Sequence, residues 1–326
     1  MPPATNLVDL ASPEALASTS ADPSALAPDN VAPDSAAQPA VLRKINDFVE
    51  LSKPRMNFLV VATTLVGFAV TARNSAEWRL LPPTLIGTAL CAAAASTLNQ
   101  VWEHRLDALM ARTRMRPIPT GRISPADALV FGLTLALLGA ASLVLLVNPL
   151  TAIIGGLTIV SYVLLYTPLK RRTTLCTVVG AIPGALPPVM GWTAVHNSLG
   201  LGAVALFAIL FLWQMPHFLA IAILYKNDYA AGGFRMLPCE DPGLHATSRQ
   251  IVLFSLALIP ATFMPSMLAM AGSVYFGAAV VLGLAFLAFA LAAARSRARR
   301  DARNLFLASI VYLPILLTFL VADRLP

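Results

Sequence analysis

Residues 99–122 read NQVWEHRLDALMARTRMRPIPTGR, and they follow an apolar stretch that is long enough to cross a bilayer. Asn99, Glu103 and Asp107 in this segment are spaced by four residues. On a helix this spacing turns the side chain by about 40° per step and advances it by about 6 Å, so the three share one face. Acidic groups stacked at a membrane surface repel one another unless a cation lies between them. The segment therefore predicts an oxygen-donor metal site at the end of a membrane helix.

Arginines follow the acidic residues at the same spacing. Arg112 and Arg116 are four residues apart, and the guanidinium fork binds phosphate oxygens well. The predicted ligand is therefore a metal-complexed phosphate or diphosphate. The alternative interpretation is that the acids are solvated loop residues or form ordinary ion pairs, such as Glu103 with Arg105. The helix dipole disfavours carboxylates near a C-terminal end, which makes an ordinary structural role less favourable.

The whole chain has the composition of a membrane protein. It is 57% hydrophobic and only 12% charged, and a soluble protein would carry roughly twice that charged fraction. Nine apolar segments predict membrane spans: 56–73, 80–99, 125–147, 150–167, 175–195, 200–224, 250–271, 274–294 and 304–322. The predicted fold class is all-α, a polytopic membrane protein with nine transmembrane helices around a central cavity and cytoplasmic loops that cap it.

Basic residues concentrate in alternate gaps between the spans. Lys53 and Arg55 precede the first span, and Lys170 and Arg171 follow the fourth. The positive-inside rule then predicts a cytoplasmic N-terminus and, after nine spans, a periplasmic C-terminus. The excess positive charge belongs to these loops, which predicts contact with the lipid bilayer and no nucleic-acid partner.

Residues 1–40 differ from the rest of the chain. They hold seven prolines, eleven alanines, five acidic residues and no lysine or arginine. This composition predicts a disordered acidic tail, followed by a surface helix near 41–52 and a membrane domain over 41–326. The tail lacks the pattern of a secretory signal or a mitochondrial presequence, which favours a bacterial inner membrane.

The loop over 225–249 repeats the theme of residues 99–122. Tyr225, Asp228 and Tyr229 begin it directly after a predicted span, four spans later than the first loop. This spacing predicts an internal pseudo-repeat with two acidic sites that face one cavity. The alternative is two unrelated solvated loops.

Single residues within the predicted spans also suggest chemistry. His217 follows Pro216 inside an apolar span, where an ionisable side chain is a functional candidate. It either contacts a substrate or hydrogen-bonds to the carbonyl that the proline leaves free. The prolines and glycines of 180–192 predict a break or a kink in the fifth span. Two compatible interpretations are close helix packing through small residues and a cavity widened for a large planar substrate. The tyrosines at 166, 225 and 229 either stabilise a cation or anchor the helices at the interface.

The pattern NxxxExxxDxxMxRTxxRP over Asn99–Pro117 resembles the aspartate-rich signature of the membrane-embedded aromatic prenyltransferase superfamily. Three further segments are similar to the branch that farnesylates haem B: YTPLKR at 166–171, GAIPGALPPVMGW at 180–192, and WQMPHF at 213–218 with the downstream Asp228-Tyr229 and Met236-Leu237-Pro238. The resemblance covers about residues 45–322. The superfamily usually has aspartate where this chain has Glu103, and Asp228 has no acidic neighbour four residues away.

The resemblance implies transfer of a farnesyl group from farnesyl diphosphate to haem B, which yields haem O. It implies Mg²⁺ held by Asn99, Glu103, Asp107 and Asp228, and these residues with Arg112 and Arg116 as the catalytic set. The other substrate-binding candidates are Lys53, Arg55, Lys170, Arg171, Tyr166, His217, Tyr225 and Tyr229. Downstream partners would be haem A synthase or a terminal oxidase. The rival interpretations are prenyl transfer to an aromatic quinone or chlorophyll precursor, and a secondary transporter with broken helices.

Overall fold

The structure, a computed structural model, describes residues 39–325. The chain separates into two compact units, residues 1–43 and 44–326, and the fold below is that of the second unit. The predicted tail lies outside the described residues except for Pro39 and Ala40, so it stays a prediction. The predicted surface helix is present as α1 (Ala40–Leu51).

Nine helices in the described part of the chain are long and apolar enough to cross a membrane, which confirms the predicted fold class of an all-α polytopic protein. The spans are α2 (Pro54–Thr71), α4 (Leu81–Asp107) after the short α3 (Ser75–Trp78), α5 (Pro125–Leu146), α6 (Pro149–Val160) with η3 (Ser161–Tyr166) and α7 (Thr167–Leu169), α8 (Cys176–His196), α9 (Leu201–Leu224), α12 (His245–Met267), α13 (Ser273–Ser296) and α14 (Arg299–Ala322). Two short helices, α10 (Lys226–Ala231) and α11 (Leu237–Glu240), connect α9 to α12.

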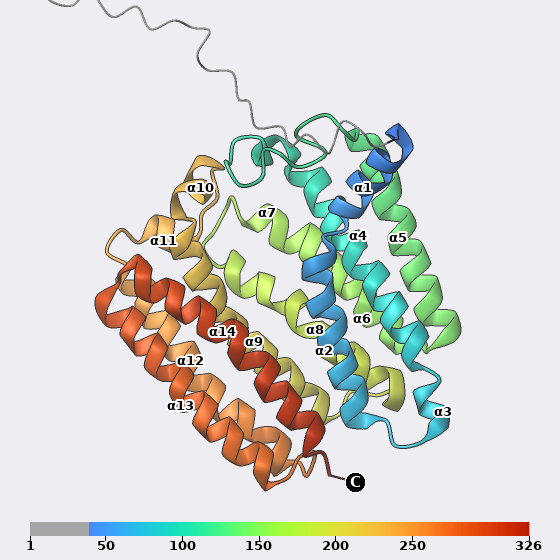
Figure 1. Cartoon of the computed structure of the whole chain (residues 1–326), viewed down its shortest axis with the longest axis vertical. Helices are drawn as coiled ribbons and strands as arrows, with labels where there is room; N and C mark the ends of the chain where they lie inside the picture. The colour runs from blue at the N-terminus through green and yellow to red at the C-terminus, as the bar shows by residue number, and fades with distance from the viewer. Residues whose placement is uncertain (1–38, 326) are drawn as a thin grey trace, which may run out of the picture. The chain divides into compact units, whose positions relative to one another are not determined.

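Figure 1 shows the long helices side by side, with α7, α10 and α11 toward one end and α3 at the other. Several helices begin with a proline, for example Pro54, Pro125 and Pro149, where the missing N–H has no helical partner to lose. Ser124 and Asn148 cap the helices that follow them by accepting a backbone hydrogen bond.

Helix α4 is longer than the sequence predicts. The apolar pattern predicts an end near residue 99, but the helix continues to Asp107. The first nine residues of the segment 99–122 are therefore helical and not loop. This extension gives Asn99, Glu103 and Asp107 a rigid backbone at the end of a span.

The fifth span is not broken, because α8 runs continuously over Cys176–His196; a kink at its prolines stays a prediction. Its glycines instead allow close packing on α2. A Cβ atom added to Gly191 would lie 2.1 Å from the carbonyl oxygen of Thr64, and one added to Gly67 would lie 2.0 Å from that of Pro188. The interpretation of close packing through small residues is thus confirmed.

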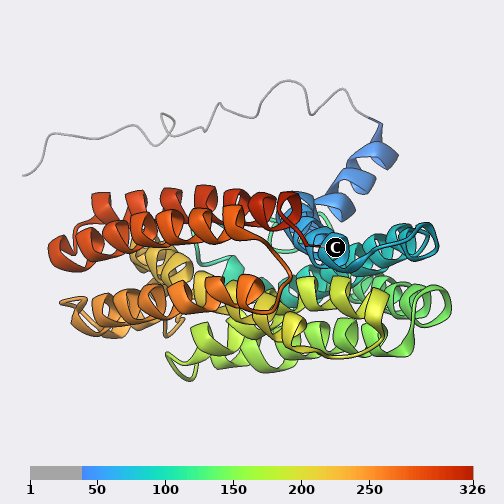
Figure 2. The ribbon, with the colours of Figure 1, turned by 90° about the horizontal axis from the view of Figure 1, so that it is seen from below.

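The end of α14 returns to the first span and closes the bundle. The guanidinium of Arg324 donates hydrogen bonds to the carbonyl oxygens of Ala69 and Ala72 at the C-terminal end of α2. The carboxylate of Asp323 accepts a hydrogen bond of 2.7 Å from the backbone N–H of Tyr275 in the first turn of α13. Figure 2 shows this end of the bundle, where the C-terminus lies beside the first span.

Candidate active site

The three residues of the predicted ladder lie on one buried face of α4. Asn99, Glu103 and Asp107 are 2%, 4% and 1% exposed. Buried carboxylates are costly unless they are paired or bind a metal. Each of the three side chains has a partner that is distant in the sequence or lies in the adjoining loop. These partners bring residues from different segments of the chain together around α4.

Glu103 is paired with Lys170 at the end of α7. The ammonium nitrogen lies 2.9 and 3.1 Å from the two carboxylate oxygens, and both side chains are buried. The same ammonium lies 4.4 Å from the ring centre of Tyr166 and 5.6 Å from that of Phe234. Burial alone would disfavour the charged amine, but Tyr166 and Glu103 outweigh it and raise the pKa of Lys170. Lys170 is therefore a fixed cation of the site.

Asp107 is paired with Arg116 within the same segment. Arg116 Nη1 donates to Asp107 Oδ2 at 2.7 Å, and the arginine is only partly buried. The Thr113 hydroxyl donates to the Asp107 carbonyl oxygen at 2.8 Å, which folds the loop back over the end of α4. The predicted i, i+4 spacing of Arg112 and Arg116 thus belongs to a loop that turns back, and only Arg116 contacts the ladder.

Asn99 is oriented by Thr167, which the sequence did not mark as a site residue. Asn99 Nδ2 donates to Thr167 Oγ1 at 2.9 Å, and that hydroxyl donates in turn to the Tyr162 carbonyl oxygen at 2.8 Å. The π-helical turn η3 places Thr167 there, and such turns are frequent at functional sites. Since Nδ2 is engaged, the amide oxygen of Asn99 is the atom left to bind a cation.

The second loop contacts the first, whereas the internal pseudo-repeat with two facing acidic sites stays a prediction. The Arg112 guanidinium lies 5.5 Å from the ring centre of Tyr225 and 5.9 Å from that of Tyr229. The backbone N–H of Arg235 donates to the Lys170 carbonyl oxygen at 2.7 Å. The second loop therefore contacts both the first loop and the segment that carries Lys170.

The side chain of Asp228 does not join the ladder in this structure. It lies half-buried in the first turn of α10 and has no hydrogen-bond or ion-pair partner among the described residues. Over residues 39–325, no three His, Cys, Asp or Glu side chains are close enough to hold a metal ion. The oxygen donors gathered by α4 are two carboxylates and one amide, a set that suits a hard cation such as Mg²⁺.

Lys53 is the third cation near the ladder. It caps α2 with left-handed backbone angles, φ 48° and ψ 61°, a rare conformation for a residue with a side chain. Burial, with the neighbouring cations Arg116 and Lys170, lowers the pKa of Lys53 to about 7. With Lys170, Arg116 and Lys53 protonated, three positive charges stand against two carboxylates, and the excess favours an anionic ligand.

Two of the predicted cations do not join this group through their side chains. Arg55 and Arg171 are exposed, and neither guanidinium has a hydrogen bond or an ion pair with any residue of 39–325. Arg55 and Arg171 are close in the sequence to Lys53 and Lys170. Side chains of neighbouring residues on a helix or turn point in different directions, so this closeness does not bring their guanidinium groups to the ladder.

His217 lies between α9 and α14. Its Nδ1 lies 2.6 Å from the Ser309 hydroxyl, and its ring stacks on Trp213 with ring centres 4.9 Å apart. This nitrogen is therefore engaged by Ser309 on the neighbouring helix, and no hydrogen bond joins His217 to the carbonyl freed by Pro216 among the described residues. A contact between His217 and a substrate stays a prediction.

Comparison with known proteins identifies the family. The profile of the UbiA prenyltransferase family matches residues 60–313. The chain belongs to the UbiA prenyltransferase family. It is accordingly a multi-pass membrane enzyme that transfers prenyl groups.

Individual relatives narrow the comparison. The chain is 43% identical over 290 residues to the protoheme IX farnesyltransferase of Solibacter usitatus, with 86% of this chain and 99% of that one covered. It is 45% identical over 282 residues to the protoheme IX farnesyltransferase of Myxococcus xanthus, with 86% and 95% covered. A UbiA homologue from Archaeoglobus fulgidus, solved with DMAPP and Mg²⁺, has the same fold at 15% identity, with a TM-score of 0.61 and 85% and 99% covered.

Proposed function

We propose that this UbiA-family enzyme transfers the farnesyl group of farnesyl diphosphate to a vinyl group of haem B, which gives haem O and diphosphate. The identity of 43–45% to curated protoheme IX farnesyltransferases, over nearly their whole length, carries the proposal. The buried, positively charged group around α4 supports it, because that group suits a diphosphate.

The chain's own residues explain how the diphosphate would be held. Asn99, Glu103 and Asp107, with Asp228 from the second loop, would bind Mg²⁺ through oxygen atoms. Bound Mg²⁺ would supply positive charge to the oxygens of the leaving diphosphate. Lys170, Arg116 and Lys53 lie around the ladder. Arg112 from the loop would add charge, and Arg55 at the start of α2 and Arg171 after α7 would contribute from further away. These fixed cations stabilise the negative charge that develops as the C–O bond breaks.

The proposed reaction balances without a redox cofactor. The bond from C1 of the farnesyl group to the diphosphate oxygen breaks, and its electron pair leaves with the diphosphate. The π electrons of the haem vinyl group form the new bond to C1, which leaves a cation on the adjacent vinyl carbon. Water adds there and releases one proton. The rings of Tyr166, Tyr225 and Tyr229 would face the cationic species, and the apolar spans would exclude bulk water from it.

We infer the setting from the charge pattern. The basic loops favour the cytoplasmic side of a bacterial inner membrane for the site and the N-terminus, with the C-terminus periplasmic. His217 would contact haem B, and haem O would pass to haem A synthase or to a terminal oxidase. The polar ring and its position inside a span support the first of these roles.

The test is haem extraction and mass analysis from a host that lacks its own haem O synthase. Wild type should yield haem O and Asp107→Ala should not, while the exposed Arg114→Ala should behave as wild type. Haem O from Asp107→Ala would contradict the role of the ladder. If folded wild type in the membrane yields no haem O but prenylates an aromatic quinone precursor, the proposed acceptor is wrong.

A further inference from the structure

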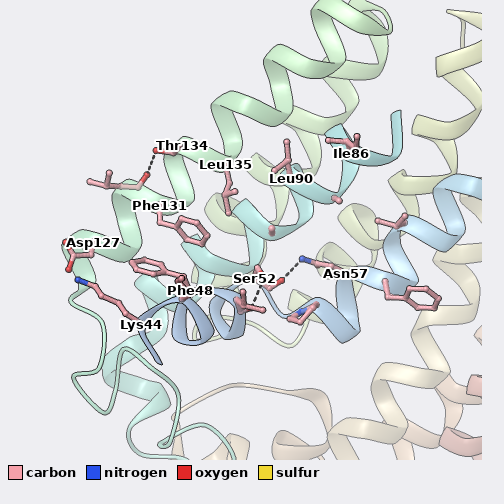
Figure 3. A pocket seen from close by; sticks show the side chains of 18 residues that line it. Lys44, Phe48, Ser52, Asn57, Ile86, Leu90, Asp127, Phe131, Thr134 and Leu135 are labelled. Carbon is pink, nitrogen blue, oxygen red and sulfur yellow. Dashed lines mark hydrogen bonds between the residues drawn. The ribbon is translucent and has the colours of Figure 1, made fainter. Parts of the chain in front are cut away.

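A groove lies on the other side of α4 from the active site (Figure 3). Its volume is about 1120 Å³, and its walls come from α1, α2, α4 and α5. Leu90 lines it, and Leu90 and Asn99 are nine residues apart, which is about half a turn around the helix. The groove is therefore separate from the ladder, and the proposed reaction does not use it.

The walls of the groove are apolar along most of its length. Phe48 of α1 and Phe131 of α5 lie against each other there, with ring centres 4.9 Å apart, and Phe58, Ile86 and Leu90 extend the apolar lining. From Asp127 in the first turn of α5, the lining descends eight residues to Leu135, about 12 Å. Three of the four walls are membrane spans, so the groove runs from the interface into the depth of the hydrocarbon.

The polar end of the groove carries one cation and one anion. Figure 3 shows Lys44 and Asp127 beside each other at this end. No ion pair or hydrogen bond engages the ammonium of Lys44 or the carboxylate of Asp127 among the described residues. The polar side chain of Asn57, further along the groove, donates a hydrogen bond to the Ser52 carbonyl oxygen. Two unpaired opposite charges at the mouth of an apolar groove match a headgroup that carries both signs.

We propose that the groove binds one phosphatidylethanolamine molecule of the bilayer. The Lys44 ammonium pairs with the lipid phosphate, and the Asp127 carboxylate accepts hydrogen bonds from the primary ammonium of the headgroup. The acyl chains lie between Phe48, Phe131 and Leu90. A phosphatidylglycerol headgroup would leave Asp127 without a cation, and the quaternary ammonium of phosphatidylcholine has no N–H to donate to it.

The structure explains why such a lipid would be retained. The C-terminal end of α1 is fixed to the bundle, because Gln100 Nε2 donates to the Leu51 carbonyl oxygen at 2.7 Å and Arg122 pairs with Asp47 and Glu50. Lys44, Ile45, Phe48 and Val49 of α1 border the groove. A lipid in the groove therefore contacts one helix of the interface and three spans at once, which distinguishes it from a lipid that touches a single span.

The experiment measures lipid selectivity in detergent-purified, delipidated full-length protein. Native mass spectrometry with equal amounts of phosphatidylethanolamine, phosphatidylglycerol and phosphatidylcholine should give a one-to-one complex with the first, preferred about threefold to fivefold, the size of an exposed charge pair. Asp127→Asn, which leaves the helix cap of Ser124 intact, should abolish the preference over phosphatidylcholine. Lys44→Glu should weaken binding of all three lipids.

The exposed Arg114→Ala serves as the matched control and should retain the wild-type preference. Equal binding of the three lipids by wild type would show an unselective annular shell and overturn the proposal. An unchanged preference in Asp127→Asn would overturn the assignment of the headgroup. Neither outcome bears on haem O formation, which is measured separately.

Discussion

Removing Lys170 should destabilise the protein far more than removing a basic residue from an exposed ion pair. Lys170 and Glu103 are both buried, with nitrogen–oxygen distances of 2.9 and 3.1 Å. Lys170→Met leaves the carboxylate of Glu103 buried without its nearest partner. The loss of one member of a buried pair costs about 3–5 kcal/mol in the free energy of unfolding.

This cost is large enough to measure as a melting temperature. For 150–250 residues, 1 kcal/mol shifts the midpoint by roughly 2–4 °C. The lower value suits this larger chain, so Lys170→Met should lower the midpoint by about 6–10 °C. Thermal unfolding of the purified protein without substrate, followed by size-exclusion fluorescence, provides the assay. Arg235→Met is the matched control, because its pair with Glu240 is exposed and should cost less than about 1 kcal/mol.

A double-mutant cycle makes the reasoning refutable. Glu103→Gln combined with Lys170→Met removes both charges. The double variant should therefore lose less free energy of unfolding than the sum of the losses in the two single variants. If the two losses add, or if Lys170→Met shifts the midpoint no more than Arg235→Met, the buried pair does not stabilise the fold as argued.

Three further predictions follow from the geometry. Because the pKa of Lys53 is about 7, its amine is mostly protonated below pH 7 and mostly neutral above it. Bound diphosphate favours the protonated amine, so the affinity of the wild type for inorganic diphosphate, measured by calorimetry, should decline from pH 7 to 9 more than that of Lys53→Met. Parallel pH profiles of the two proteins would refute this. Thr167→Val should weaken Mn²⁺ binding, measured by electron paramagnetic resonance, about fivefold or more because Asn99 loses its partner, whereas Thr167→Ser should not. Gly191→Ala should cost about 1–3 kcal/mol in the thermal assay, because its Cβ would lie 2.1 Å from the Thr64 carbonyl oxygen. Gly156→Ala is the control, since a Cβ added there has no neighbouring atom within 4 Å outside its own helix backbone and adjoining residues. Equal losses of stability in the two variants would contradict the argument.

The sequence predicted the spans and the ladder because both depend on local pattern. Apolar length marks a helix that must satisfy its own backbone in lipid, and a spacing of four marks a helix face. The end of α4 was missed because hydropathy falls at Asn99 while backbone hydrogen bonding continues to Asp107. Polarity ends the apolar stretch, but it does not end the helix.

The pairings within the site depend on tertiary structure. Lys170 and Glu103 are 67 residues apart, and no local pattern selects that pair over one with Arg171. The π-helical turn that brings Thr167 to Asn99 has no composition of its own, since YTPLKR also suits an ordinary helix end. The prolines of α8, judged by their local chemistry alone, suggested a break or a kink. In the structure α8 is continuous, and it packs closely against α2.

The contact between Arg324 and the end of α2 has a consequence for biogenesis. The contact joins residues 255 positions apart, so it can form only after the ribosome has synthesised all nine spans and the membrane has received them. Until then the carbonyl oxygens of Ala69 and Ala72 need water as their partner, which keeps this end of the first span at the interface during insertion. Closure of the bundle is thus a late step of assembly, and an insertion between Ala322 and Arg324 should interrupt maturation after every helix is already in place.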